Sequence, residues 1–351
     1  MKKITAIALL SIALVACKKE TKIITKIDPT TGDTIKMEIP LEDSAKVAKE
    51  LAEKAAIKDS AGVYKQSLKL EKGKTYPFTT YQKNNVSLNA STGEKKSAIS
   101  ESQDDVTFTV NDIQNNVYDI TINFVAKRTS QTVDGKNYVV DTKQPAPKEE
   151  ELKNKWNLDK ALVGNKLNMK MDTNGKIISI TGFEPVYTRI STTIAKLTKD
   201  ANVRKGFQEE AKASFNEEIL RDQFTKNMKI MPEKGVKIGE KWTKTENASQ
   251  DGKIKLATNY TLKSVKDGVA EITLSGGIPL QSNKATTQGV TQTLSSELTQ
   301  NGSLKPDVNS GWIINQNISV KTTQKESYSD GKQSQTMTNI TNSSIIVNPN
   351  K

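Results

Sequence analysis

Few residues in this chain have the chemistry of a catalytic nucleophile or a transition-metal ligand. The 351 residues include no histidine and a single cysteine, Cys17. Without histidine, Ser-His-Asp and Cys-His systems and every metal site with an imidazole ligand are excluded. The sequence also contains no Gly-rich phosphate loop of the Walker or dinucleotide-binding type. Chemistry based on carboxylates or on a Ser-Lys pair remains.

The strings that could serve these two chemistries have simpler structural interpretations. The Ser-x-x-Lys string at residues 329–332 encloses Asp-Gly, which is typical of a hairpin turn. The neighbouring acids at 209–210 and 217–218 point to different sides of a helix and indicate a solvated surface. We therefore predict no catalytic residue, no metal and no cofactor. A carboxylate-based hydrolase is the third hypothesis for function, and it needs two acids in one cleft about 5 to 10 Å apart.

Cys17 follows a segment typical of a secretory signal peptide. Residues 1–16 combine early lysines, an apolar run too short to span a bilayer and a small residue before the cysteine. Residues 14–17, Leu-Val-Ala-Cys, resemble the lipobox of bacterial lipoproteins, in which the cysteine is acylated. Two or three acyl chains, at about 0.8 kcal/mol per buried methylene, exceed what stable anchoring needs. We predict that Cys17 is a lipidated membrane tether. The alternative is a core or disulfide cysteine, but a lone cysteine at a signal junction cannot form a disulfide within its chain.

The chain is basic, but the kind and distribution of its charges do not favour nucleic-acid binding. The formal net charge of +12 falls to +10 when the signal peptide and its two lysines are removed. Phosphate recognition favours the planar fork of arginine, yet the chain has only four arginines. The other positive charges are lysines scattered among acids, a pattern that solubilises a surface. Lysines at positions 18 and 19, with no aspartate, predict the outer membrane by analogy with lipoprotein sorting.

Residues 17–63 are predicted to form the lipidated cysteine and a spacer. They are poor in large apolar side chains and contain proline and glycine breakers, with one alanine-rich helix expected at 44–58. Three Asp-(Ser/Thr)-aliphatic or small strings occur here and nowhere after residue 63. They resemble the acceptor of the O-glycosylation system of Bacteroidota, which makes Thr34, Ser44 and Ser60 candidate glycosylation sites. Accidental matches, and helix capping by Ser44, are the alternatives.

A β-dominated α+β fold is predicted beyond the spacer. We expect a first β lobe at 64–185, a helical segment at 186–231 and a second β lobe at 232–351. Alternating apolar and polar residues predict strands at 106–110, 117–124, 176–180, 270–274 and 313–320. Tight antiparallel turns are predicted at six Asp-Gly or Asn-Gly pairs, which start at residues 134, 174, 251, 267, 301 and 330.

The two lobes resemble each other in sequence. Segments at 73–78, 110–122 and 171–183 of the first lobe correspond to 239–244, 264–274 and 306–320 of the second. Each lobe has roughly 120 residues, enough to bury its own core or to share one with the other lobe. Chance similarity among hairpins is the alternative.

The central segment is predicted to contain two amphipathic helices. Ile190, Ile194 and Leu197 define the first, and an apolar stripe from Val203 to Met228 defines a longer second helix. Such a stripe is typical of a helix that packs on the concave face of a sheet. The alternative is a lid over an apolar ligand cavity. The candidate lid residues are Phe207, Phe215 and Phe224.

The three tryptophans suggest glycan stacking, but a structural role explains them better. Trp242 and Trp312 lie at equivalent strand starts of the repeat, and Trp156 precedes a helical pattern. We predict core positions or contacts between lobes for them. Residues 144–156, which contain two prolines, are predicted to be a surface linker inside the first lobe.

The chain resembles a family of unknown function among Bacteroidota cell-envelope lipoproteins. The resemblance lies in residues 70–83, 161–183, 234–242 and 276–284, and it covers nearly everything after the spacer. It implies a location and a fold class but no reaction. Curved antiparallel sheets with covering helices are also similar to lipoprotein carriers and sensors of the Gram-negative envelope, which is an analogy at the level of fold only.

These observations predict a non-catalytic, lipid-anchored envelope protein that binds a ligand or a partner protein. Its expected partners are the membrane, through Cys17, and an envelope protein, a lipid or a glycan. The second hypothesis is a carrier or sensor of an amphiphile held under the central helices. The sequence leaves open which face of the outer membrane the protein occupies.

Overall fold

The computed structural model describes residues 21–349, apart from residues 32, 41, 42, 44, 45, 47–49, 51–53 and 250. The predicted α+β, β-dominated fold is confirmed. The strands are β1 (Thr21–Ile27), β2 (Thr34–Pro40), β3 (Ile57–Ser60), β4 (Val63–Gln66), β5 (Thr75–Ala90), β6 (Lys95–Gln114), β7 (Val117–Val133), β8 (Lys136–Asp141), β9 (Lys166–Asp172), β10 (Ile177–Thr181), β11 (Lys241–Asn247), β12 (Lys255–Lys266), β13 (Val269–Thr287), β14 (Val290–Pro306), β15 (Ile313–Ser329) and β16 (Ser334–Val347). The helices are α2 (Glu150–Leu162), α3 (Phe183–Leu197), α4 (Ala201–Ser214) and α5 (Glu217–Met228).

The two predicted lobes form one continuous sheet. In the described residues this sheet has twelve strands in the order β10-β9-β7-β6-β5-β16-β15-β14-β13-β12-β11, with β8 paired to β7. Every pairing is antiparallel, and the first strand of the first lobe, β5, pairs with the last strand of the second, β16. The lobes therefore share a sheet, and one hydrophobic core contains residues of both.

The core lies at one end of the long strands and follows from simple alternation. In β9, for example, Leu167, Met169 and Met171 are fully buried while the residues between them are exposed. The second lobe contributes Trp312, whose ring centroid lies 5.3 Å from that of Tyr76 in β5. The indole Nε1 of Trp312 donates a hydrogen bond to Pro77 O at 2.9 Å. Trp312 is thus both a core residue and a contact between the lobes, as predicted.

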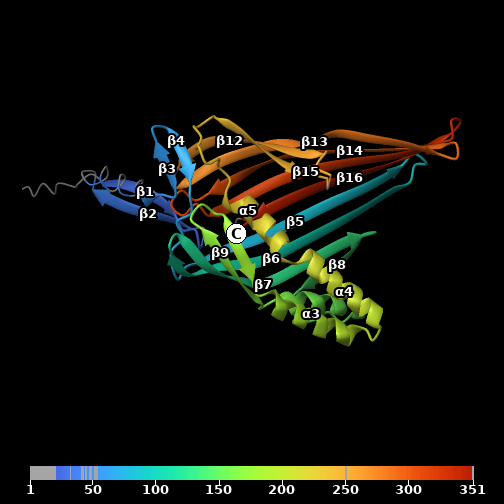
Figure 1. Ribbon diagram of the computed structural model, residues 1–351, viewed down its shortest axis with the longest axis horizontal. Helices are drawn as coiled ribbons and strands as arrows, with labels where there is room; N and C mark the ends of the chain where they lie inside the picture. The colour runs from blue at the N-terminus through green and yellow to red at the C-terminus, as the bar shows by residue number, and fades with distance from the viewer. Residues whose placement is uncertain are drawn as a thin grey trace, which may run out of the picture.

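Helix α5 lies near the centre of Figure 1 and contacts both edge strands of the sheet. On the β10 side, Ile180 N donates to Glu217 Oε1 and Arg221 Nη2 donates to Ile178 O, both at 3.2 Å. On the β11 side, Lys226 Nζ pairs with Glu246 at 2.8 Å and Lys244 Nζ donates to Lys229 O at 2.6 Å.

These bonds require the sheet to curve strongly. Laid flat, eleven strands about 4.8 Å apart would extend over about 48 Å, whereas a twelve-residue helix is about 18 Å long. Because both edges nonetheless reach α5, the sheet must bend around the helix. The backbone of edge strand β10 then bonds to α5 side chains instead of presenting free groups for aggregation.

The predicted second helix is in fact two helices. It breaks after Phe215, where the Asn216 side chain accepts a hydrogen bond from Ile219 N and donates to Lys212 O and Ala213 O. Asn216 therefore caps the start of α5 and the end of α4 together, a local signal stronger than the apolar period. The helix α2 begins within the predicted surface linker. None of the helices in the described residues has the length and apolar character needed to cross a bilayer.

Part of the predicted spacer is folded. The strands β1 and β2 pair as a hairpin, and β3 and β4 form a second one. Ala55, Ala56 and Ile57 are buried, and Ile57 N donates to Val308 O at 2.9 Å. The folded body thus begins near residue 55 rather than 64, because this short apolar run packs against the β14–β15 turn. Of the helix predicted at 44–58, eight positions lie outside the described residues, Lys46, Glu50 and Lys54 are helical, and the last two positions belong to β3.

Five of the six predicted turns are present. At 134–135 and 267–268 both residues have positive φ, as a type I′ turn requires. The prediction at 301–302 was wrong, because Asn301 and Gly302 lie inside β14. A Cβ on Gly302 would stand 2.3 Å from Asn317 O of the neighbouring strand, so glycine serves close strand approach here.

Candidate functional site

The three candidate lid residues lie in three different environments. The Phe224 ring is buried edge-on against Phe78 and Phe108, with centroids 5.6 and 5.0 Å apart. Half-buried Phe215 packs on Phe124 at 5.4 Å, whereas Phe207 is 44% exposed. Aromatic side chains of the sheet therefore fill the space beneath α5, and the arrangement matches the packing interpretation for Phe224.

The other predicted site residues lie in the N-terminal part of the chain. Cys17 and Ser44 are outside the described residues, so the structure gives no account of them. Thr34 in β2 and Ser60 at the end of β3 are both exposed, as a glycosylation acceptor must be. Glycosylation of these residues stays a prediction.

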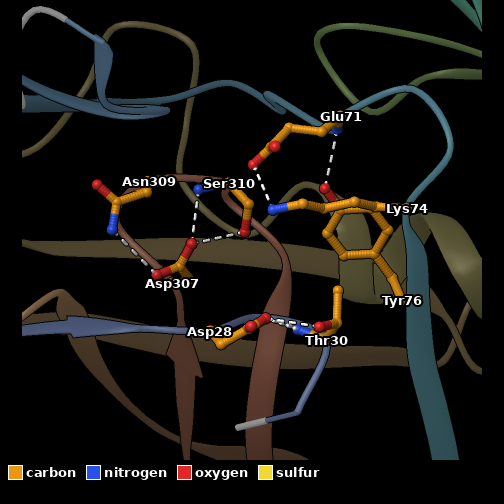
Figure 2. A network of polar contacts seen from close by, with 8 residues as sticks. All are labelled: Asp28, Thr30, Glu71, Lys74, Tyr76, Asp307, Asn309 and Ser310. Atoms are coloured by element: carbon orange, nitrogen blue, oxygen red, sulfur yellow. Dashed lines mark hydrogen bonds and ion pairs between the residues drawn. The ribbon is translucent and has the colours of Figure 1, made fainter. Parts of the chain in front are cut away.

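Figure 2 shows a polar network where β5 meets the β14–β15 turn. Asp307, fully buried, accepts hydrogen bonds from Ser310 N and Ser310 Oγ, both at 2.6 Å. Burial raises the pKa of the Asp307 carboxyl, and the bonds from Ser310 only partly oppose this effect. Burial also raises the pKa of Tyr76 to about 12, and its hydroxyl accepts from Glu71 N at 2.9 Å. The Asp307–Ser310 bonds hold the β14–β15 turn, and the bond from Glu71 N to the Tyr76 hydroxyl joins β5 to the segment before it.

Two carboxylates lie close together at the seam between α5 and β11. Asp222 and Glu246 both pair with Lys226 Nζ, at 2.9 and 2.8 Å, beside a hollow of about 550 Å³. Burial lowers the pKa of Lys226, but bonds and charges from the two acids outweigh it and the net shift is upward. The lysine therefore occupies the space between the carboxylates as a cation. In the described part of the chain, no three metal-ligating side chains lie together.

A second hollow, of about 410 Å³, lies between α2 and α3. This volume is within the range of about 300 to 1,000 Å³ that small-molecule sites occupy. Its walls are matching faces of the two helices: Trp156, Asn157, Lys160, Ala161, Thr188, Arg189, Thr192, Thr193, Lys196 and Leu197. The lining holds three cations and three threonines but no acid. The opposite face of α3 packs into the core through Val186, Ile190 and Ile194, which fixes the orientation of the helix.

The polar groups of this hollow are held by backbone bonds. Trp156 Nε1 donates to Asp141 O at 3.1 Å, and Lys160 Nζ donates to Thr142 O at 2.9 Å. The same ammonium lies over the Trp156 ring, 5.6 Å from its centroid. The strand β8 and the residues after it therefore position both side chains of α2.

Sequence reasoning did not identify this hollow. A usable signal was present: Arg189, Thr192, Thr193 and Lys196 recur at helical spacing on the polar side of α3, without an acid among them. The partner face on α2 was obscured because its first residues were predicted to be a linker. The core positions predicted for Trp242 and Trp312 are confirmed, whereas half-buried Trp156 lines the hollow.

The protein is thus a curved antiparallel β sheet with a hollow between two helices, outside the hydrophobic core. Residues 115–313 match a family of unknown function (DUF6263), and the chain belongs to this family. None of the curated proteins compared matches the chain.

Solved structures show only distant likeness. Lipovitellin, in a structure concerned with lipid–protein interactions, aligns at a TM-score of 0.37 and 11% identity over 80% of this chain. This chain spans 25% of the lipovitellin chain. OmpF of Salmonella typhi, in complex with daunomycin, gives a TM-score of 0.16 and 8% identity over 77% of this chain and 98% of its own. OccK5 (OpdH) of Pseudomonas aeruginosa gives a TM-score of 0.15 and 7% identity over 77% of this chain and 97% of its own. Likenesses this low support no argument about function.

Replacing Phe224 by alanine should test whether α5 is core or lid. A core residue packed on two rings should cost about 3 to 5 kcal/mol of unfolding free energy when truncated. The matched variant Phe207→Ala, at an exposed position of α4, should change it by no more than about 0.5 kcal/mol. Urea unfolding followed by circular dichroism measures both, and equal losses in the two variants would contradict the packing described here.

Replacing Asp307 by asparagine should flatten the pH dependence of stability. Because burial raises the pKa of Asp307 above its ordinary 3.8, the folded protein binds a proton first as pH falls. Stability from this group is therefore gained as pH falls through the raised pKa, and is lost as pH rises through the same range. The Asp307→Asn variant lacks this contribution, so its unfolding free energy should vary less with pH than that of the unmodified chain.

The control is Asp330→Asn, at an exposed turn. Backbone hydrogen bonds from Gln333 and Lys332 lower the pKa of Asp330. The contribution of Asp330 to stability has the opposite sign. It is present above pH 3.8 and is lost as the pH falls below that value. Between pH 4.5 and 7 the control should keep the slope of the unmodified chain. If Asp307→Asn keeps it too, the buried carboxyl is not the source of the slope.

Proposed function

We propose that this protein is a non-catalytic, lipid-anchored protein of the cell envelope that binds a small ligand in the hollow between α2 and α3. The observation that carries the proposal is the composition of that hollow. It combines an indole, three cations and three hydroxyl groups in a space of small-molecule size. Such convergence of polar groups beside an aromatic ring is typical of a ligand site.

The packing of the core supports a surface site over an internal carrier cavity. Phe224 contacts the aromatic rings of β5 and β6 directly, so an amphiphile under α5 would have to displace them. The seam between α5 and β11 holds its two acids on one lysine, which favours an ion-pair network over a hydrolytic pair. An amphiphile carrier and a carboxylate hydrolase would therefore both need side chains to rearrange. Binding in the α2–α3 hollow needs no such rearrangement.

The tether completes the proposal. Lipidation of Cys17 would confine the body to the membrane surface and raise its local concentration there. Weak binding would then suffice for retention of a ligand near the membrane. The location in the outer membrane is part of this proposal and rests on the sequence around Cys17.

Changing Cys17 to serine should release the protein from the membrane. Without the thiol no diacylglycerol can be attached, so the variant should leave the detergent phase in a Triton X-114 partition while the unmodified chain enters it. Mass spectrometry of the unmodified protein should show the added acyl mass. If the serine variant still partitions with detergent, the signal at 14–17 has been misread.

Native mass spectrometry of the soluble Cys17→Ser form, purified without detergent from its own kind of cell, should detect a bound small molecule. The adduct should be lost in Arg189→Ala, which removes a cation from the lining, and kept in the matched control Phe207→Ala. Retention of the adduct in Arg189→Ala would place the ligand elsewhere. A clean apo mass in every form would remove the binding proposal.

A further inference from the structure

We propose that the α2–α3 hollow takes a hydroxylated oxyanion, that is, a sugar or similar polyol that carries a carboxylate or a phosphate. This inference rests on the proposed function and adds the chemical class of the ligand. Three features of the lining lead to it: uncompensated positive charge, a preorganised guanidinium, and hydroxyl groups whose hydrogens are already in use.

The positive charge of the hollow has no acid to balance it. Lys160, Arg189 and Lys196 all line it, and within the described part of the chain none of them pairs with a carboxylate. The nearest acid along α2, Asp159, is paired with Lys155 at 2.7 Å. Lys160 and Lys196 lie in the last turns of their helices and also complement the helix dipoles. Arg189 lies in the middle of α3, where the dipole does not explain it.

The guanidinium of Arg189 is held in place from α2. Its Nη1 donates to Asn165 Oδ1 at 3.2 Å. Asn165 is itself buried and donates from Nδ2 to Ala161 O at 2.7 Å and to Leu162 O at 2.8 Å. This chain of bonds joins the two walls of the hollow and fixes one end of the guanidinium. The remaining donors of a planar fork positioned in this way suit a carboxylate or a phosphate.

The threonines in the lining favour a ligand that also donates hydrogen bonds. Thr188 Oγ1 donates to Glu184 O and Thr193 Oγ1 donates to Arg189 O, both at 2.9 Å. Each hydroxyl has one hydrogen, so these two oxygens are left with lone pairs and act toward a ligand as acceptors. An oxyanion alone cannot satisfy acceptors, whereas the hydroxyl groups of a polyol can. The Trp156 ring adds an apolar wall for the carbon skeleton of such a ligand.

The test is calorimetric titration of the full chain carrying Cys17→Ser with four probes. Galacturonate and galactose 6-phosphate carry both an oxyanion and hydroxyl groups, galactose carries hydroxyl groups alone, and inorganic phosphate carries charge alone. We expect at least one of the two anionic sugars to bind about tenfold or more tightly than galactose and than phosphate. The stronger of the two identifies the oxyanion as carboxylate or phosphate.

The variant for this test is Lys196→Glu, which places an acid in the lining. Its matched control is Lys199→Glu, an exposed position just beyond α3 that does not line the hollow. Lys196→Glu should weaken the anionic sugar about tenfold or more, and Lys199→Glu less than threefold. Unchanged thermal unfolding of both variants shows that the fold is intact.

The outcomes separate this inference from the proposed function. If galactose binds as tightly as its anionic forms, the hollow binds a ligand but the inferred need for an oxyanion is wrong. An uncharged adduct in native mass spectrometry would lead to the same conclusion. If phosphate binds as tightly as galactose 6-phosphate, the hydroxyl part of the inference is wrong. If no probe binds and native mass spectrometry finds no adduct, the proposed function fails as well.

Discussion

The fold depends on the contact that α5 makes with both edges of the sheet. Without it, the sheet would have two free edges and an open apolar face. With it, β10 and β11 are held on opposite sides of one short helix by polar bonds, while Leu220, Phe224 and Met228 fill the centre. The helix thus supplies both the apolar filling and the polar closure of the curved sheet. In the chain, α5 follows β10 after the helices α3 and α4 and precedes β11.

Much of this fold could be predicted from the sequence, because its signals are local. Alternating residues located the strands around the core, and Asp-Gly and Asn-Gly pairs located five of the hairpins. The outer ends of the long strands could not be located. Residues such as 95–104 in β6 have no apolar period, and their side chains are partly exposed on both faces of the sheet. They are strands because their neighbours pair with them. The break at Asn216 was missed because the apolar stripe continues across it, although the acids that follow are typical of a helix start.

The candidate site was the least predictable part. It is formed by faces of α2 and α3, which are separated in the chain by the strands β9 and β10, and nothing in either face alone indicates a hollow. Only the pairing of β8 with β7, and the packing of α3 on the core, brings Lys160 and Arg189 to the same place. The two lobes also differ at this point. The first lobe carries α2 between β8 and β9, whereas in the second lobe β13 and β14 are joined by the short turn at 288–289. The hollow therefore lies in a helical insertion that the second half of the sheet lacks at this connection.

The pairing of β5 with β16 sets the order in which the molecule can be completed. These strands meet over eleven residue pairs, from Thr80 with Val347 to Ala90 with Met337, although the chain between them is nearly the whole body. During synthesis, β5 emerges early and has one edge unpaired until the final strand has been made. Contacts of such long range are slow to form. Polar residues lie along that edge, among them Lys83, Asn85 and Asn89. They disfavour pairing of the unfinished sheet with a strand of another chain.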